Sequence, residues 1–149
     1  MATSTIKRER TQFKQLYKTG STQALTASAR TVSLTQYDGA GADLTLTNDG
    51  GVICGRNGRV KVSGWCVCSG VTSGDKVALQ LGRYRGSGWS NTDINPEMYS
   101  SGVGAAANVS IPTTVIAVQA NDQIYLRCYN ISAARGNIVY ASLRVEYVK

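Results

Sequence analysis

The sequence contains no histidine among its 149 residues. This absence removes the usual general base of enzymes, the Ser–His and Cys–His nucleophile pairs, and the His-rich metal sites of double-stranded β-helix enzymes. We therefore predict that the protein is not an enzyme, and we assign no catalytic, cofactor-binding or metal-binding residue.

Long apolar runs are also missing, since no segment approaches the roughly 18 to 20 residues that a membrane span needs. The beginning, "MATSTIKRERTQF", is basic but is not followed by the apolar stretch of a secretory signal. We expect synthesis in the cytoplasm and no membrane partner.

Cysteine is scarce, with four residues at positions 54, 66, 68 and 128. They are too few and too scattered for a disulfide framework in a chain without an export signal. Three of them fall within 15 residues, which suggests a zinc site. Against this hypothesis, the spacing is not Cys-x2-Cys and histidine is lacking. We predict buried free thiols and leave open whether any pair is oxidised.

Glycine is abundant instead, at 16 residues, and no long run of strong helix formers occurs. From Thr31 onward, short alternating runs such as "RVKVSGWCVC" and "QIYLRCY" are broken by Gly, Asn and Asp. Seven or eight such strands predict an all-β fold, a β-sandwich or jelly roll.

Residue parity predicts which side of each strand faces the core. In "RVKVSGWCVC" the even positions Val60, Val62, Cys66 and Cys68 would be buried, and in "QIYLRCY" the buried side would be Ile124, Leu126 and Cys128. The cysteines then serve as small buried apolar residues.

The last strand predicts an interface between subunits. Its odd positions from Val139 to Tyr147 form one apolar face, yet the opposite face carries Ile138 and Tyr140. Trp65 and Val67 likewise lie on the outward side of their strand. Because no helix pattern is present to cover these side chains, we predict that another subunit does so, through Trp65, Val67, Ile138 and Tyr140.

Positive charge is concentrated at the N-terminus. The first 30 residues contain six bases against Glu9 alone, a net charge of +5 out of +7 for the chain. We therefore predict a basic N-terminal arm at 1–30 and a jelly-roll domain at 31–149. The residues expected to dock the arm are Lys7, Arg8, Arg10, Phe13, Lys14, Leu16, Tyr17 and Lys18. The apolar members would form one face of a short helix or anchor an extended segment. Three roles of this arm remain open: it docks onto an acidic protein surface, it binds nucleic acid, or it is a solvated tail. We favour docking onto an acidic surface.

A long irregular segment, 82–104, is the predicted recognition loop. It contains residue types that are enriched in binding hot spots, namely Arg83, Tyr84, Arg85, Trp89 and Tyr99. Loops of this length are more often functional than idle, although packing at the end of the sandwich or between subunits is an equal alternative.

Two acids begin strands in the same context, Asp75 in "SGDKVALQL" and Asp122 in "ANDQIYLRC". We predict that each carboxylate accepts backbone N–H groups and tightens its turn. A paired-carboxylate hydrolase would instead need the two to converge at about 5 to 10 Å.

The order of these segments resembles the C-terminal half of the C1q/TNF-like jelly roll. The most specific element, Val118 to Leu126, is similar to the family pattern Leu-x-x-Gly-Asp-x-Val-x-Leu, with Asn121 in place of the preferred Gly. The resemblance covers about 56–149. It implies a homotrimer around a threefold axis, with the first, third and last strands toward the axis.

Such domains occur in secreted animal proteins and in structural proteins of tailed bacteriophages. The stretch "STIKRERTQFKQLY" with its Ser/Thr/Ala linker resembles the attachment segment of a phage head-fibre, decoration or tail-tip protein. The resemblance thus implies a non-enzymatic virion protein, docked on capsid or tail, whose exposed surface binds a host receptor or glycan. The alternatives are a small jelly-roll coat protein with a nucleic-acid-binding arm and a secreted TNF/C1q-like ligand.

Overall fold

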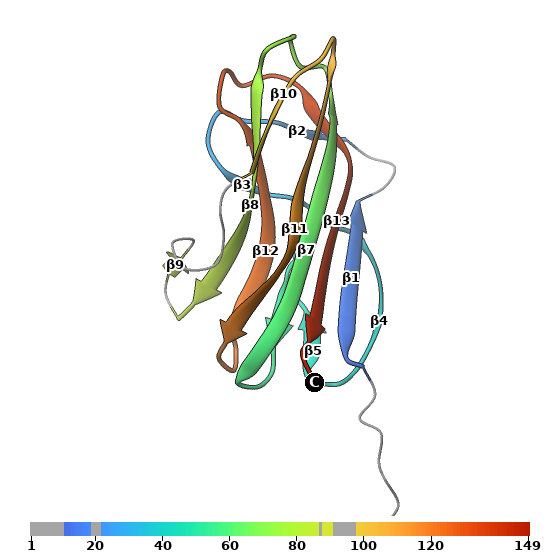
Figure 1. The fold of residues 1–149 in the computed structure, drawn as a ribbon, viewed down its shortest axis with the longest axis vertical. Helices are drawn as coiled ribbons and strands as arrows, with labels where there is room; N and C mark the ends of the chain where they lie inside the picture. Colours follow the sequence, from blue (N-terminus) through green and yellow to red (C-terminus); the bar gives the residue numbers. More distant parts are fainter. Residues whose placement is uncertain (1–10, 19–21, 87, 91–97) are drawn as a thin grey trace, which may run out of the picture.

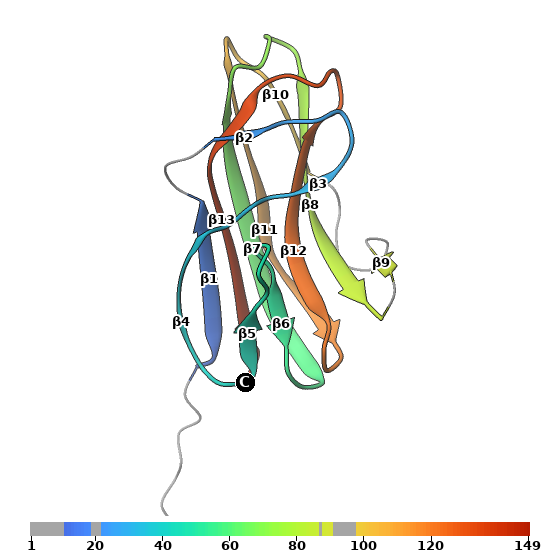
Figure 2. The same ribbon diagram turned by 180° about the vertical axis from the view of Figure 1, so that it is seen from behind.

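The computed structural model describes residues 11–18, 22–86, 88–90 and 98–149. These residues form two antiparallel sheets packed face to face and contain no helix, which confirms the predicted jelly-roll β-sandwich. Figures 1 and 2 show the sandwich from opposite sides, with the long strands running along the long axis of the molecule. The described residues accordingly include no helix that could cross a membrane.

The first sheet has the order β11-β7-β13-β1-β4, with β2 paired to β13. Its strands are β1 (Phe13–Lys18), β2 (Gln23–Ala24), β4 (Gln36–Ala40), β7 (Gly58–Ser69), β11 (Ala106–Val118) and β13 (Asn137–Tyr147).

The second sheet has the order β10-β8-β12-β6-β5, with β3 paired to β12 and β9 paired to β8. Its strands are β3 (Arg30–Thr31), β5 (Leu44–Leu46), β6 (Val52–Cys54), β8 (Lys76–Arg85), β9 (Gly88–Ser90), β10 (Met98–Ser101) and β12 (Gln123–Asn130).

The core lies between the sheets and follows the predicted parity. The inward residues of β7 and β12 are all buried, namely Val60, Val62, Cys66, Cys68, Ile124, Leu126 and Cys128. All four cysteines are buried free thiols. Gly64 faces the same core, and a Cβ atom there would sit 2.7 Å from Leu126 Cδ1, so the glycine lets the two sheets approach closely.

The predicted arm boundary at residue 30 is wrong, because β1 is an integral strand of the first sheet. β1 pairs with β13 on one side and with β4 on the other. Leu16 and Lys18 are buried, whereas Phe13 and Tyr17 are partly buried. The strand satisfies the backbone groups of β13, a long-range pairing that outweighs the local helical spacing of Phe13, Leu16 and Tyr17.

A bulge in β13 overturns the predicted face of Ile138. Ile138 pairs with Cys68 and Tyr140 with Val67, so Val139 is the extra residue between them. A single extra residue in a strand moves the residues before it to the opposite faces of the sheet from those that simple alternation predicts. Ile138 is therefore buried in the core at 1% exposure, and Tyr140 faces outward as predicted.

Candidate functional site

The outer face of the first sheet carries an exposed apolar patch formed by Trp65, Val67 and Tyr140. Trp65 is 41% exposed and Tyr140 is 49% exposed. Val67 lies directly opposite Tyr140 across the β7–β13 pair, and Trp65 is two residues before it on the same side. Directly opposite residues have Cβ atoms about 4.5 to 5.5 Å apart, so these side chains form one continuous surface. We call this surface the outer patch.

Small polar residues flank the outer patch. Ser110 and Ser142 lie opposite Trp65 on β11 and β13, and Asn108 lies opposite Val67 on β11. Ser142 is buried and accepts a hydrogen bond of 3.2 Å from Gln15 Nε2. The two exposed aromatic residues thus have small polar neighbours, and Trp and Tyr are residue types enriched in binding hot spots.

The opposite end of this face is polar and internally satisfied. Arg144 lies over the Phe13 ring at 4.3 Å from its centroid, and its Nη1 donates to Gln15 Oε1 at 3.2 Å. Its Nη2 also lies 3.5 Å from Glu146. The outer patch is thus the aromatic cluster of this face, and Val115 on β11, opposite Lys61, is a separate exposed apolar residue.

The structure divides the predicted docking residues into three groups. Leu16 and Lys18 are buried and cannot contact a partner. Phe13, Lys14 and Tyr17 are partly exposed on β1, with the Lys14 ammonium 6.0 Å from the centroid of the Tyr37 ring. Lys7, Arg8 and Arg10 lie outside the described residues.

The predicted recognition loop is shorter than expected, because its first residues belong to β8. Arg83 is buried and donates to the carbonyl oxygen of Ala117 at 3.4 Å, while Arg85 binds Asp122. Both arginines are therefore held by the domain itself. Tyr99 is 46% exposed with the Lys76 ammonium 4.0 Å from its ring centroid.

The aromatic residues at the start of the loop are separated from Tyr99 by residues 91–97, which lie outside the described chain. Tyr84 is partly exposed and is paired with Trp89 of β9, whose side chain is also outside the described part. The structure does not bring these residues together into one described site.

The two acids at the starts of strands each accept a backbone N–H group and tighten their turn, as predicted. We call these two turns the corners. Asp122 accepts the Gln119 N–H at 2.8 Å, and Asp75 accepts the Thr72 N–H at 2.9 Å. Each turn contains a left-handed residue, Asn121 with φ of 73° and Gly74 with φ of 89°.

An arginine closes each corner. Arg85 binds Asp122 through two nitrogens, and Arg135 binds Asp75 in the same way. The two turns lie at opposite ends of the β8–β12 pair, ten residues and about 34 Å apart at roughly 3.4 Å per residue, so the two carboxylates do not form a hydrolase pair.

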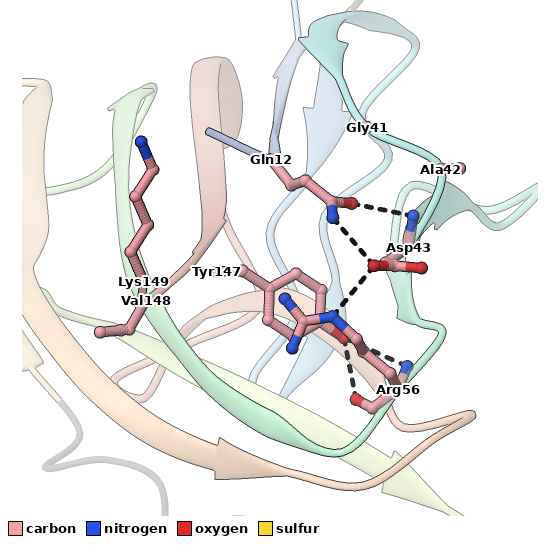
Figure 3. Close-up of a pocket in the computed structure, with 8 residues that line it drawn as sticks. All are labelled: Gln12, Gly41, Ala42, Asp43, Arg56, Tyr147, Val148 and Lys149. Carbon is pink, nitrogen blue, oxygen red and sulfur yellow. Dashed lines mark hydrogen bonds and ion pairs between the residues drawn. The ribbon is translucent and has the colours of Figure 1, made fainter. Parts of the chain in front are cut away.

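A pocket of about 430 Å³ lies at the end of the sandwich where β1 begins and β13 ends. We call it the base pocket (Figure 3), and it is lined by Gln12, Gly41, Ala42, Asp43, Arg56, Tyr147, Val148 and Lys149. Hydrogen bonds from Gln12 and Arg56 hold the pKa of the Asp43 carboxyl below its usual value. Sequence reasoning missed this site because its residues come from four separate segments with no shared motif.

Among the described residues, no three Cys, Asp or Glu side chains lie close enough together to hold a metal ion. Cys66, Cys68 and Cys128 are buried in the apolar core. Hydrogen bonding between the thiols and burial raise the pKa of Cys68, so the thiolate that a metal needs is disfavoured.

The fold is similar to solved structures of TNF and C1q domains. Murine APRIL matches with a TM-score of 0.71 at 13% identity, over 93% of this chain and 100% of that chain. The Eiger TNF of S. frugiperda matches with a TM-score of 0.68 at 13% identity, over 94% of both chains. The globular domain of zebrafish complement 1qA matches with a TM-score of 0.68 at 12% identity, over 94% of this chain and 98% of that chain. No protein-family profile and no curated protein matches the sequence.

These similarities establish a C1q/TNF-like jelly-roll fold. The identities are too low to carry more than the fold, and function must therefore be argued from the surfaces of this chain.

Proposed function

We propose that this protein is a non-enzymatic, homotrimeric structural component of a bacteriophage virion, attached to capsid or tail through its N-terminal segment. The observation that carries the proposal is the outer patch, in which Trp65, Val67 and Tyr140 form an exposed apolar surface on the face of a sheet. Exposed patches of this kind mark protein interfaces, and a second and third copy of the chain supply the cover.

The position of the outer patch favours a self-interface. It lies on β7 and β13, the central strands of the sheet that also holds β1. The C1q/TNF resemblance of the sequence implies contacts around a threefold axis through these strands. Three patches that meet at such an axis would bury all three aromatic pairs in one contact.

The attachment end is the end at which β1 begins. The sequence before Gln12 contains Lys7, Arg8 and Arg10 against Glu9, and it resembles a phage attachment segment. In the assembled particle this end would face the virion. The opposite end and the second sheet would face outward, where Tyr99 and Lys76 offer a surface for a host receptor or glycan.

Packaging of nucleic acid is the weaker alternative, because β1 removes half of the predicted arm from solution. Before β1 the chain has a net charge of +2, from Lys7, Arg8 and Arg10 against Glu9. So few charges release few counterions from nucleic acid and give weak binding at physiological salt.

A TNF- or C1q-like ligand is the second candidate, since the fold is that of murine APRIL and the zebrafish complement 1qA domain. The location of the protein distinguishes the two functions. Antibody detection in purified phage particles supports the virion role, and its absence there with recovery from the medium of producing cells supports the ligand. Light scattering of the purified protein tests the trimer that both functions share.

A further inference from the structure

The base pocket contains an arginine that is held in one orientation. Arg56 Nε donates to Asp43 Oδ2 at 2.9 Å, and the guanidinium carbon lies 3.9 Å from the centroid of the Tyr147 ring. The Tyr147 hydroxyl donates to the Arg56 carbonyl oxygen at 2.9 Å, which fixes the backbone of the same residue. Figure 3 shows Tyr147 and Arg56 between Asp43 and Lys149.

Gln12 completes this arrangement. Its Nε2 donates to Asp43 Oδ2 at 2.8 Å, and its Oε1 accepts the Asp43 N–H at 2.9 Å. Gln12 therefore holds both the carboxylate and the backbone of Asp43, and the carboxylate in turn orients the guanidinium of Arg56. An arginine that is fixed before binding loses little side-chain entropy when a ligand arrives.

The Nη1 and Nη2 atoms of Arg56 remain available, since neither has a hydrogen-bond acceptor among the described residues. The Lys149 side chain adds a second cation to the lining, and the one acidic side chain of the lining, Asp43, already binds Arg56. A guanidinium with a free edge matches a carboxylate through two parallel hydrogen bonds. A volume of about 430 Å³ exceeds what a bare anion fills and accommodates a side chain with part of its backbone.

We propose that the base pocket binds an Asp or Glu side chain of an acidic peptide segment on the partner to which this protein is attached. The pocket lies where the chain enters the sandwich, and the preceding sequence adds Lys7, Arg8 and Arg10. An acidic segment is therefore complementary in charge to both. The identity of the partner as an anchor rests on the proposed function, whereas the carboxylate chemistry rests on the pocket alone.

The test is a titration of the full chain with the blocked peptide Ac-Glu-Glu-Glu-NH2 at low salt, followed by NMR at the Arg56 side chain Nε and the Val148 amide. We expect saturable shifts at these positions and none with Ac-Gln-Gln-Gln-NH2. Arg56→Lys keeps the charge but loses the planar fork, and we expect affinity to fall about tenfold. Arg59→Gln is the matched control, because Arg59 is exposed at the start of β7 but does not line the pocket. It should change affinity less than about twofold, since only diffuse charge is lost.

Equal losses for Arg56→Lys and Arg59→Gln would overturn the proposal, because binding would then be diffuse attraction to a basic surface. Sodium glucuronate that binds at least as tightly as the peptide would also overturn it and identify a sugar-acid site. Should Arg56→Lys fail to fold, Lys149→Gln provides the second variant, with the same expected loss of affinity. Light scattering on the same samples separates the two proposals: a monomer that still binds the peptide contradicts the trimer and leaves the pocket intact.

Discussion

Asp122 binds Arg85 through both carboxylate oxygens, with Oδ1 2.7 Å from Nε and Oδ2 2.6 Å from Nη2. Oδ2 also accepts the Gln119 N–H, so one buried acid joins the turn before β12 to the end of β8. Asp122 therefore tightens the turn before β12, as the sequence predicted.

Replacing this acid should destabilise the fold. Asp122→Asn removes the charge from the Arg85 contact and leaves a buried amide with a nitrogen against the guanidinium. We expect the free energy of unfolding in urea to fall by about 1 to 3 kcal/mol, a range that allows for water screening of the partly exposed Arg85. Asp38→Asn, an exposed acid on β4, is the control and should change stability by less than about 0.5 kcal/mol. Equal effects would contradict the assigned role.

The free energy of unfolding should fall in acid, because the carboxyls of Asp75 and Asp122 become protonated. The hydrogen bonds from Arg135 hold the pKa of Asp75 well below its usual value. Burial opposes the shift at Asp122, but Arg85 and the Gln119 N–H lower its pKa as well. A carboxyl with a lowered pKa in the folded state stabilises the protein above its unfolded pKa of about 4, and this stabilisation is lost as the pH falls toward the folded pKa.

We therefore expect the free energy of unfolding to be flat from about pH 7 to 5 and to decrease below about pH 4. The double variant Asp75→Asn, Asp122→Asn should be less stable at neutral pH and should show a shallower acid slope. Urea unfolding at several pH values measures this. An unchanged slope in the double variant would mean that other carboxyls cause the acid sensitivity.

The sequence predicted those features that depend on local chemistry. The parity of β7 and β12 and the role of both corner acids follow from alternation and turn residues. The bulge at Val139 could not be predicted, because it arises from pairing with β7, whose paired residues Val67 and Cys68 lie far away in the sequence. The placement of β1 between β13 and β4 and the base pocket depend on similarly distant contacts. Because of the bulge, the sequence prediction for Ile138 is wrong, whereas the prediction that Trp65, Val67 and Tyr140 lie on the outer face is confirmed.

The left-handed backbone of Asn121 predicts different effects for two substitutions at this position. Asn121→Gly should leave stability within about 1 kcal/mol of the original, because glycine adopts a positive φ without steric cost. Asn121→Val should destabilise by about 1 to 3 kcal/mol, because a β-branched side chain clashes in this region. Thermal unfolding distinguishes the variants. Equal melting temperatures for both would show that the turn relaxes out of the left-handed region.

The cysteines should be unreactive in the folded protein. Burial raises the pKa of the Cys54 thiol to about 12, with the charge of Asp122 adding to the effect. Since the thiolate is the reactive form, labelling by a disulfide reagent at pH 8 should be negligible without denaturant and complete in guanidinium chloride. Four thiols should then react, one for each free cysteine. Rapid labelling of native protein would show that the sandwich opens or that a thiol is exposed.

The central claim, assembly through the outer patch, is tested most directly by light scattering coupled to gel filtration at micromolar concentration. We expect three times the mass of one chain for the unchanged protein and for Tyr99→Asp, which alters an exposed aromatic residue on the second sheet. Trp65→Ala and Tyr140→Asp should shift the mass toward one chain while their circular dichroism spectra stay unchanged, since both side chains lie outside the core. A monomer of the unchanged protein, or a trimer that survives both outer-patch substitutions, would contradict the account.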